Sequence, residues 1–99
     1  MPTFDIPEQF LRDWVRLTPE QQAAFRKARD EFVEDLRAGK GFRAGLRVKG
    51  VQGKRNKGVF ELTWAPNGRA TWQYGPEQRQ GHSHVIWRRV GDHGIFTQP

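Results

Sequence analysis

Hydrophobic residues recur at helical spacing through the first 38 residues, in two separate runs. The first run follows an N-cap residue at Asp5 and predicts a short helix over residues 6–17. Its apolar members are Phe10, Leu11, Trp14, Val15 and Leu17. Such spacing gives the helix one face that can be buried against the rest of the chain.

The second run carries stronger signals at both of its ends. Thr18 precedes Pro19, and Gln21 stands three residues after the threonine, which is the pattern of a capping box. The run ends before Gly39, a residue type that often terminates helices. We therefore expect a second helix over residues 19–38, with an apolar stripe made of Phe25, Ala28, Phe32 and Leu36. The two helices together predict a helix hairpin over residues 5–38.

After Gly41 the pattern changes to alternating apolar and polar residues, which indicates β-strands. The glycine-rich and basic segment 51–58 interrupts the alternation and is expected to be a loop. The expected strands begin near Leu46, cover 59–64, 69–74 and 84–90, and are completed by a short tail over 94–97.

The link between the strands over 59–64 and 69–74 predicts their register. If residues 66–68 form a three-residue loop with Gly68 in the left-handed conformation, Ala65 pairs with Arg69 and Glu61 pairs with Gln73. All polar residues then lie on one face of the hairpin. A two-residue loop would place each apolar residue opposite a polar one, so we expect the three-residue loop.

These elements predict a single α+β domain over residues 1–99. The helix hairpin covers one face of a small, mainly antiparallel twisted sheet over residues 45–97. The covered face is expected to carry Phe60, Leu62, Trp64 and Trp72. The other face is expected to be open and to carry Glu61 and Arg69.

Charge divides the chain into two unequal parts. Residues 1–38 hold six basic and eight acidic residues, whereas residues 39–99 hold eleven basic and three acidic ones. Seven basic residues and no acidic residue lie between Lys40 and Lys57. Arginine outnumbers lysine twelve to five, and guanidinium groups bind phosphate in a bidentate way. The pattern favours a nucleic acid as partner, the alternative being a solvated basic surface.

Several classes of function are excluded by what the sequence lacks. It contains no cysteine, so disulfides, thiol catalysis and zinc sites with sulfur ligands are ruled out. His82 and His84 have a spacing that can bind a metal, but no third ligand is near them, so we expect neither metal nor cofactor. No apolar run can cross a membrane and no secretory signal opens the chain, so we expect a cytoplasmic protein.

The basic part of the chain contains the groups needed to cleave RNA without a metal. Glu61 is the candidate base for the 2′-hydroxyl, and His93 is the candidate acid for the leaving 5′-oxygen. Arg69 is the candidate cation for the charge that develops on the phosphate. Further candidates for phosphate binding are Arg47, Lys49, Lys54, Arg55, Lys57, Arg88 and Arg89.

Each of these assignments has a plainer alternative. Glu61 could equally form a cross-strand salt bridge, and His93 could equally be a turn residue without a role. Each cation could be a solvating residue when taken alone. The set is more persuasive than its members.

The order of elements resembles the RelE superfamily of bacterial toxins over almost the whole chain. The residues that carry this resemblance are the strand over 46–50, the Gly68-Arg69 pair that opens a strand after the hairpin turn, the strand over 85–91 and the terminal segment 93–96. The resemblance implies a RelE-like fold and a toxin that cleaves mRNA, commonly in the ribosomal A site. It also implies an acidic antitoxin that covers the basic face and keeps the toxin inactive.

The same resemblance suggests roles for individual residues. Arg47 and Lys49 match the basic strand of the family, Arg69 matches its active-site arginine, and His93 matches its C-terminal basic or histidine position. Phe96 falls where many members have tyrosine. A phenylalanine cannot donate a proton, so its expected role is to stack on an RNA base.

Two other functions are compatible with these patterns. A non-catalytic module that binds RNA or the ribosome would need the basic face but neither Glu61 nor His93. A toxin directed at a protein, such as a gyrase inhibitor with the same fold, would use the basic face on an acidic protein surface.

Overall fold

Two helices lie at the N-terminal side of the computed structural model, which describes residues 1–99. Helix α2 (Pro19–Ala38) begins and ends where the sequence predicts. The Thr18 hydroxyl accepts a hydrogen bond from the Gln21 amide at 3.1 Å, and the Gln21 side chain accepts one from the Thr18 amide at 2.8 Å. Gly39 ends the helix in the left-handed conformation with a φ of 69°. The expected capping box and C-terminal glycine are confirmed.

The first helix is shorter than expected. Helix α1 (Glu8–Trp14) starts after Pro7, whose extended backbone stands at the N-cap position without a side-chain cap. Asp5 is therefore not the N-cap, and the expected start at residue 6 is wrong. The reason is that residues 3–5 are already committed to a strand.

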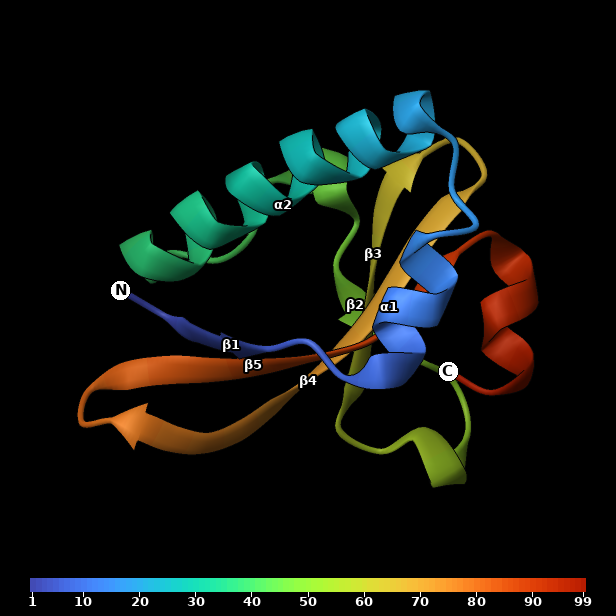
Figure 1. The fold of residues 1–99 in the computed structure, drawn as a ribbon. Helices are drawn as coiled ribbons and strands as arrows, with labels where there is room; N and C mark the ends of the chain where they lie inside the picture. Colours follow the sequence, from blue (N-terminus) through green and yellow to red (C-terminus); the bar gives the residue numbers. More distant parts are fainter.

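Five strands form one sheet in the order β1-β5-β4-β3-β2 (Figure 1). Their bounds are β1 (Thr3–Asp5), β2 (Lys49–Gly50), β3 (Val59–Ala65), β4 (Gly68–Arg79) and β5 (His82–Gly91). Only β1 runs parallel to its neighbour, and all other pairs are antiparallel. The expected class, an α+β fold with helices on a mainly antiparallel sheet, is confirmed. No helix is long and apolar enough to span a lipid bilayer.

Strand β1 was not expected from the sequence. A buried histidine of β5, His84, contacts two of its residues. The Nδ1 atom of His84 lies 2.7 Å from the Thr3 hydroxyl, and its Nε2 atom lies 3.1 Å from the Asp5 carboxylate. Only three residues of β1 pair, and their partners lie about eighty positions later in the chain. A strand of three residues is too short to show a periodic pattern, and its partners are far away in the sequence, so the sequence did not predict it.

The β3–β4 hairpin differs from its predicted register by two residues. Thr63 pairs with Arg69 and Glu61 with Thr71, while a bulge around Trp64 lets Ala65 pair with Gly68 across a two-residue turn. The expected three-residue loop is therefore wrong. Apolar residues still face apolar residues because the bulge restores the parity that a two-residue turn would otherwise break.

Gly68 serves a different purpose from the one expected. Its φ is not positive, but a Cβ atom at this position would lie 2.5 Å from the Trp64 indole ring. The indole nitrogen of Trp64 donates a hydrogen bond of 2.9 Å to the carbonyl of Arg69. Glycine is required here because the indole packs directly on the turn.

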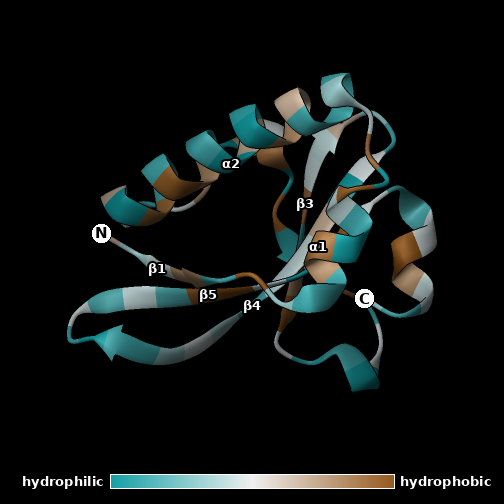
Figure 2. Ribbon diagram, viewed as in Figure 1, coloured by the Kyte–Doolittle hydropathy of each residue, from teal (hydrophilic) through white to brown (hydrophobic).

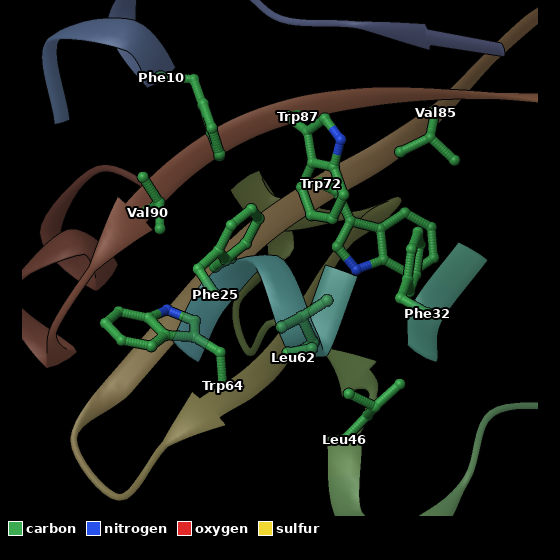
Figure 3. Packing of buried hydrophobic residues seen from close by; sticks show 12 residues of the cluster. Phe10, Phe25, Phe32, Leu46, Leu62, Trp64, Trp72, Val85, Trp87 and Val90 are labelled. Carbon is green, nitrogen blue, oxygen red and sulfur yellow. The ribbon is translucent and has the colours of Figure 1, made fainter. Parts of the chain in front are cut away.

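The core lies between the helices and one face of the sheet and is built mainly from aromatic rings (Figure 3). Phe32 of α2 lies 4.9 Å from Trp72, centroid to centroid, and Phe25 lies 5.5 Å from Trp87. The hydrophobic residues of α2 face the sheet, while the tip of the β4–β5 hairpin is hydrophilic (Figure 2). Leu62 and Trp64 are buried on this face as expected.

Two segments expected to be extended are single turns of 3-10 helix. Ala44–Leu46 forms the first, and Arg47 follows it with a positive φ of 48°, so only Lys49–Gly50 remains to pair with β3. His93–Thr97 forms the second, labelled η3, in place of the expected strand tail. Both lie beside the sheet but outside its hydrogen-bonded ladder.

Candidate nucleic-acid interface

A row of polar side chains crosses the sheet on the face opposite the core. Lys49 of β2 pairs with Glu61 of β3, which pairs with Thr71 of β4, which in turn pairs with Arg89 of β5. Directly paired residues have Cβ atoms roughly 5 Å apart. The register therefore brings a carboxylate, a hydroxyl and two cations from four strands into one line. The Lys49 ammonium lies 4.0 Å from the Glu61 carboxylate.

Arg88 joins this row through a bulge in β5. Thr71 pairs with Arg89 while Trp72 pairs with Trp87, so Arg88 is the extra residue between them. Its Nη1 atom donates to the side-chain oxygen of Gln73, which lies two residues after Thr71 on β4. This bond holds the guanidinium over the sheet.

The Arg88 and Thr71 side chains converge on one oxygen atom. Arg88 Nε donates to the backbone oxygen of Pro99 at 2.9 Å, and the Thr71 hydroxyl donates to the same atom at 3.2 Å. Residues 98 and 99 thus pass over the face that was expected to be open. Thr71 has no exposed surface and the Glu61 side chain is only 12% exposed, so that expectation is wrong.

Arg89 binds the buried carboxylate of Asp13, a residue that was not predicted from the sequence to belong to the site. Its Nε atom lies 2.6 Å from Asp13 Oδ2 and its Nη2 atom 3.1 Å from Oδ1. Asp13 also accepts the Val90 amide at 3.2 Å, beyond the point where β1 stops pairing with β5. In place of the predicted RNA contact, these bonds give Arg89 a structural role that joins α1 to the sheet.

The surroundings of Asp13 favour its ionised form. Burial of the carboxyl acts to raise its pKa, but hydrogen bonds from Arg89 and Val90 outweigh burial and lower the pKa below its ordinary value. Asp13 lies three residues after Phe10, on the buried side of α1. An acidic residue at a core-facing helical position was the signal available in the sequence.

Arg69 lies at the end of the sheet, on the same strand as Thr71. Its Nη1 atom donates to the carbonyls of Ala65, Pro66 and Gly68 at 3.2, 3.2 and 2.9 Å. The guanidinium is folded back over the β3–β4 turn, with one of its three nitrogens used in this way. Arg69 pairs with Gly91, two residues before His93.

His93 and Phe96 lie together on η3. Their ring centroids are 5.9 Å apart in an edge-on arrangement, and His93 is exposed. The Asp92 carboxylate accepts the Gly94 amide at 2.7 Å and caps the segment. Ile95 is buried and anchors it against the sheet. The two sequence-predicted residues are thus held near the end of β5 that carries Arg88.

Exposed cations lie just before β2 and along the loop between β2 and β3. They are Arg47, Lys54, Arg55 and Lys57. Arg43, from the same basic run, is instead bound to α2, where it lies 2.9 Å from Asp35 and 3.3 Å from Glu31. The hydrogen bonds from Arg43 lower the pKa of Asp35. Arg43 is therefore not available to the cationic surface formed by Arg47, Lys54, Arg55 and Lys57.

No protein-family model matches the sequence, and no curated protein matches it. Solved structures do match it over nearly their whole length. In the DinJ-YafQ toxin-antitoxin complex from E. coli, the similar chain has a TM-score of 0.67 and 13% identity, with 95% of this chain and 94% of that one covered. The chain has the fold of the RelE-superfamily toxins.

Two further structures support the same conclusion. The YoeB/ParE toxin from Agrobacterium tumefaciens has a TM-score of 0.65 at 10% identity, covering 92% of this chain and 98% of that one. The toxin-antitoxin complex RelBE2 from Mycobacterium tuberculosis contains a chain with a TM-score of 0.54 at 22% identity, with 92% and 96% covered. The RelE-like fold predicted from the sequence is confirmed.

Proposed function

We propose that the protein is the toxin of a toxin–antitoxin pair and that it cleaves RNA without a metal ion. The observation that carries the proposal is the convergence of the Thr71 hydroxyl and Arg88 Nε on a single oxygen atom. Two donors that meet on one oxygen provide the geometry of a phosphate-binding site. A phosphate oxygen of RNA would take the place that the Pro99 oxygen holds.

Glu61 is the proposed base of such a site. It lies directly across from Thr71, on the strand next to the one whose hydroxyl binds the oxygen. It would take the proton of the 2′-hydroxyl, whose oxygen then forms a bond to the neighbouring phosphorus. Arg88 would stabilise the negative charge that develops on the phosphate oxygens.

His93 would complete the reaction by giving a proton to the 5′-oxygen as its bond to phosphorus breaks. The products are a 2′,3′-cyclic phosphate and a free 5′-hydroxyl. Phe96, whose ring lies edge-on to His93, would stack on a base next to the cleaved bond. Arg69 would bind the same or the next phosphate through its remaining nitrogens.

An antitoxin is the proposed protein partner. Two of the similar structures are toxin–antitoxin complexes. Residues 39–99 carry eleven basic and three acidic residues, so a chain with acidic segments complements this part of the surface. Expression of the protein alone should arrest bacterial growth, and co-expression of its antitoxin should restore growth.

The decisive experiment measures cleavage of mRNA by purified protein, without ribosomes in the presence of EDTA and with ribosomes in a magnesium buffer. Arg88→Ala should reduce the rate about 100- to 1000-fold, the loss typical of a transition-state ligand. Arg79→Ala is the matched control, since Arg79 is an exposed arginine near the tip of the β4–β5 hairpin, and its rate should be unchanged. Melting temperatures of both variants establish that they fold.

Glu61→Gln and His93→Gln test the base and the acid in the same assay. Equal rates for these two variants, Arg88→Ala and the parent would overturn the catalytic assignment. RNA binding without cleavage by the parent would identify a non-catalytic module. Growth arrest with neither binding nor cleavage would favour a toxin directed at a protein.

A further inference from the structure

A groove of about 760 Å³ opens at the end of the sheet, next to the polar row, and one member of that row, Arg89, is among its lining residues. One wall is the α1–α2 junction with Arg16 and Leu17, and a second is the β3–β4 turn with Asn67. The third wall is the junction of β5 and η3, with Asp92 and Ile95. None of the residues that bind the Pro99 oxygen lines it.

The groove adjoins the proposed cleavage site on two sides. Arg69 donates to the carbonyls of Ala65, Pro66 and Gly68, and all three of these residues line the groove. On the other side Asp92 lines the groove, and the next residue is His93. An RNA strand held between Arg69 and His93 would therefore reach the groove with a neighbouring nucleotide.

The charges of the groove do not suit a second phosphate. Asp13 and Arg89 form an ion pair, and the two other charged lining residues, Arg16 and Asp92, are of opposite sign, so the net charge of the groove is zero. The walls combine the apolar side chains of Leu17 and Ile95 with polar groups at the rim. An unpaired nucleobase has the same division, an apolar ring face and a polar edge.

We propose that this groove binds the base of a nucleotide that flanks the cleaved phosphodiester bond. The inference rests on the proposed RNA-cleaving function and adds a specificity site to it. The volume lies within the roughly 300–1,000 Å³ common for small-molecule sites, enough for a base with its ribose. Asn67 is exposed at the rim and reads the base edge.

The polar groups of the rim favour bases that carry an exocyclic amino group. Asp92 uses Oδ1 to accept the Gly94 amide, which leaves Oδ2 as an acceptor. The Asn67 amide oxygen is a second acceptor when the amino group of the same amide is turned to the solvent. Adenine and cytosine present an amino donor to such acceptors, whereas uracil presents a carbonyl at the same position. The groove should therefore discriminate against uracil.

The test maps the cleavage sites of the full-length protein on a long RNA of mixed sequence. The parent should cut with a preference against uracil at one position beside the cut, and Asn67→Ala should reduce that preference about two- to tenfold, the effect of one hydrogen bond. Gln80→Ala, an exposed amide on the distant hairpin, should leave the preference intact.

Binding to short 2′-O-methyl homopolymers, which cannot be cleaved, separates this inference from the proposed function. If Asn67→Ala and Asn67→Asp both cleave RNA with the base preference of the parent, the groove assignment is overturned and the proposed function stands. Absence of cleavage, with tighter binding of A or C than of U that Asn67→Ala removes, would overturn the function alone. Base-independent binding without cleavage would overturn both.

Discussion

Replacing Asp13 with asparagine tests whether the bond between α1 and the end of β5 stabilises the fold. The aspartate side chain is 4% exposed and accepts four hydrogen bonds, two from Arg89 and one each from Val90 and Gln9. Asparagine keeps one oxygen acceptor but loses the charge, and its amino group cannot accept the Arg89 Nε–H. The substitution therefore leaves a guanidinium that is 20% exposed without its counter-ion.

The magnitude follows from the number and kind of bonds lost. Hydrogen bonds to charged groups contribute about 1.5–3 kcal/mol each, and removal of one partner of a buried pair costs about 3–5 kcal/mol. Arg89 keeps some access to water and asparagine keeps one acceptor, so we expect a loss of about 3 kcal/mol. For a domain of this size that corresponds to a fall in Tm of roughly 12–24 °C.

The pH dependence distinguishes lost charge from lost packing. The pKa of Asp13 is lowered in the folded protein, so the ionised carboxylate contributes stability above the unfolded pKa and loses it as the pH falls through the folded value. Urea unfolding of the parent and of Asp13→Asn should give a constant difference above about pH 5. The difference should narrow below about pH 4, because protonated Asp13 resembles asparagine.

Asp30→Asn is the matched control, since the Asp30 side chain is 71% exposed and pairs with Arg29 at the surface. Its effect should stay within about 0.5 kcal/mol. A loss for Asp13→Asn as small as that of the control, or a difference that does not change between pH 6 and pH 3, would refute the reasoning about the Asp13–Arg89 bond.

Three further predictions concern the turn, the long helix and the basic loop. Gly68→Ala should destabilise the protein by about 2 kcal/mol in urea unfolding, because a Cβ atom would lie 2.5 Å from the Trp64 ring, whereas Gly45→Ala, with open space around it, should be tolerated. Thr18→Ala should cost about 1 kcal/mol in the same assay through loss of the helix cap, and no measurable loss would refute the role of the cap. Binding of single-stranded RNA, measured by anisotropy, should show a slope of about −3 in log K against log salt if the exposed cations Arg47, Lys54, Arg55 and Lys57 each contact a phosphate, and a slope near zero would remove RNA as the partner.

The parts of the fold that depend on local chemistry could be predicted from the sequence. Helix α2 carries its start signal at Thr18 and its stop signal at Gly39, and both act within one turn of the helix. The helix-on-sheet arrangement could be predicted because hydrophobic residues recur at helical spacing up to residue 38 and at alternating positions after Gly41. The hairpin register required knowledge of the bulge at Trp64, which depends on how the indole packs and not on the turn residues.

The candidate site was predictable only in part, because its contacts join distant segments. Glu61 and Lys49 were identified by charge, and the register does pair them. Arg88 and Arg89 could not be told apart in the sequence. In the structure Arg88 binds the Pro99 oxygen together with Thr71, whereas Arg89 binds Asp13. Burial, not residue type, decides between these roles.

The pairing of β1 with β5 also constrains the order in which the molecule can be assembled during synthesis. Thr3 bonds with His84 across a separation of 81 residues, and Asp13 bonds with Arg89 across 76. Contacts of such high sequence separation form late, because a long loop must close before they are made. Residues 3–13 therefore leave the ribosome well before their partners and are among the last segments to pair. Until residue 90 has left the ribosome, β1 and α1 have no strand to pack against. The Asp13 carboxylate, which is buried in the folded protein, is solvated until then.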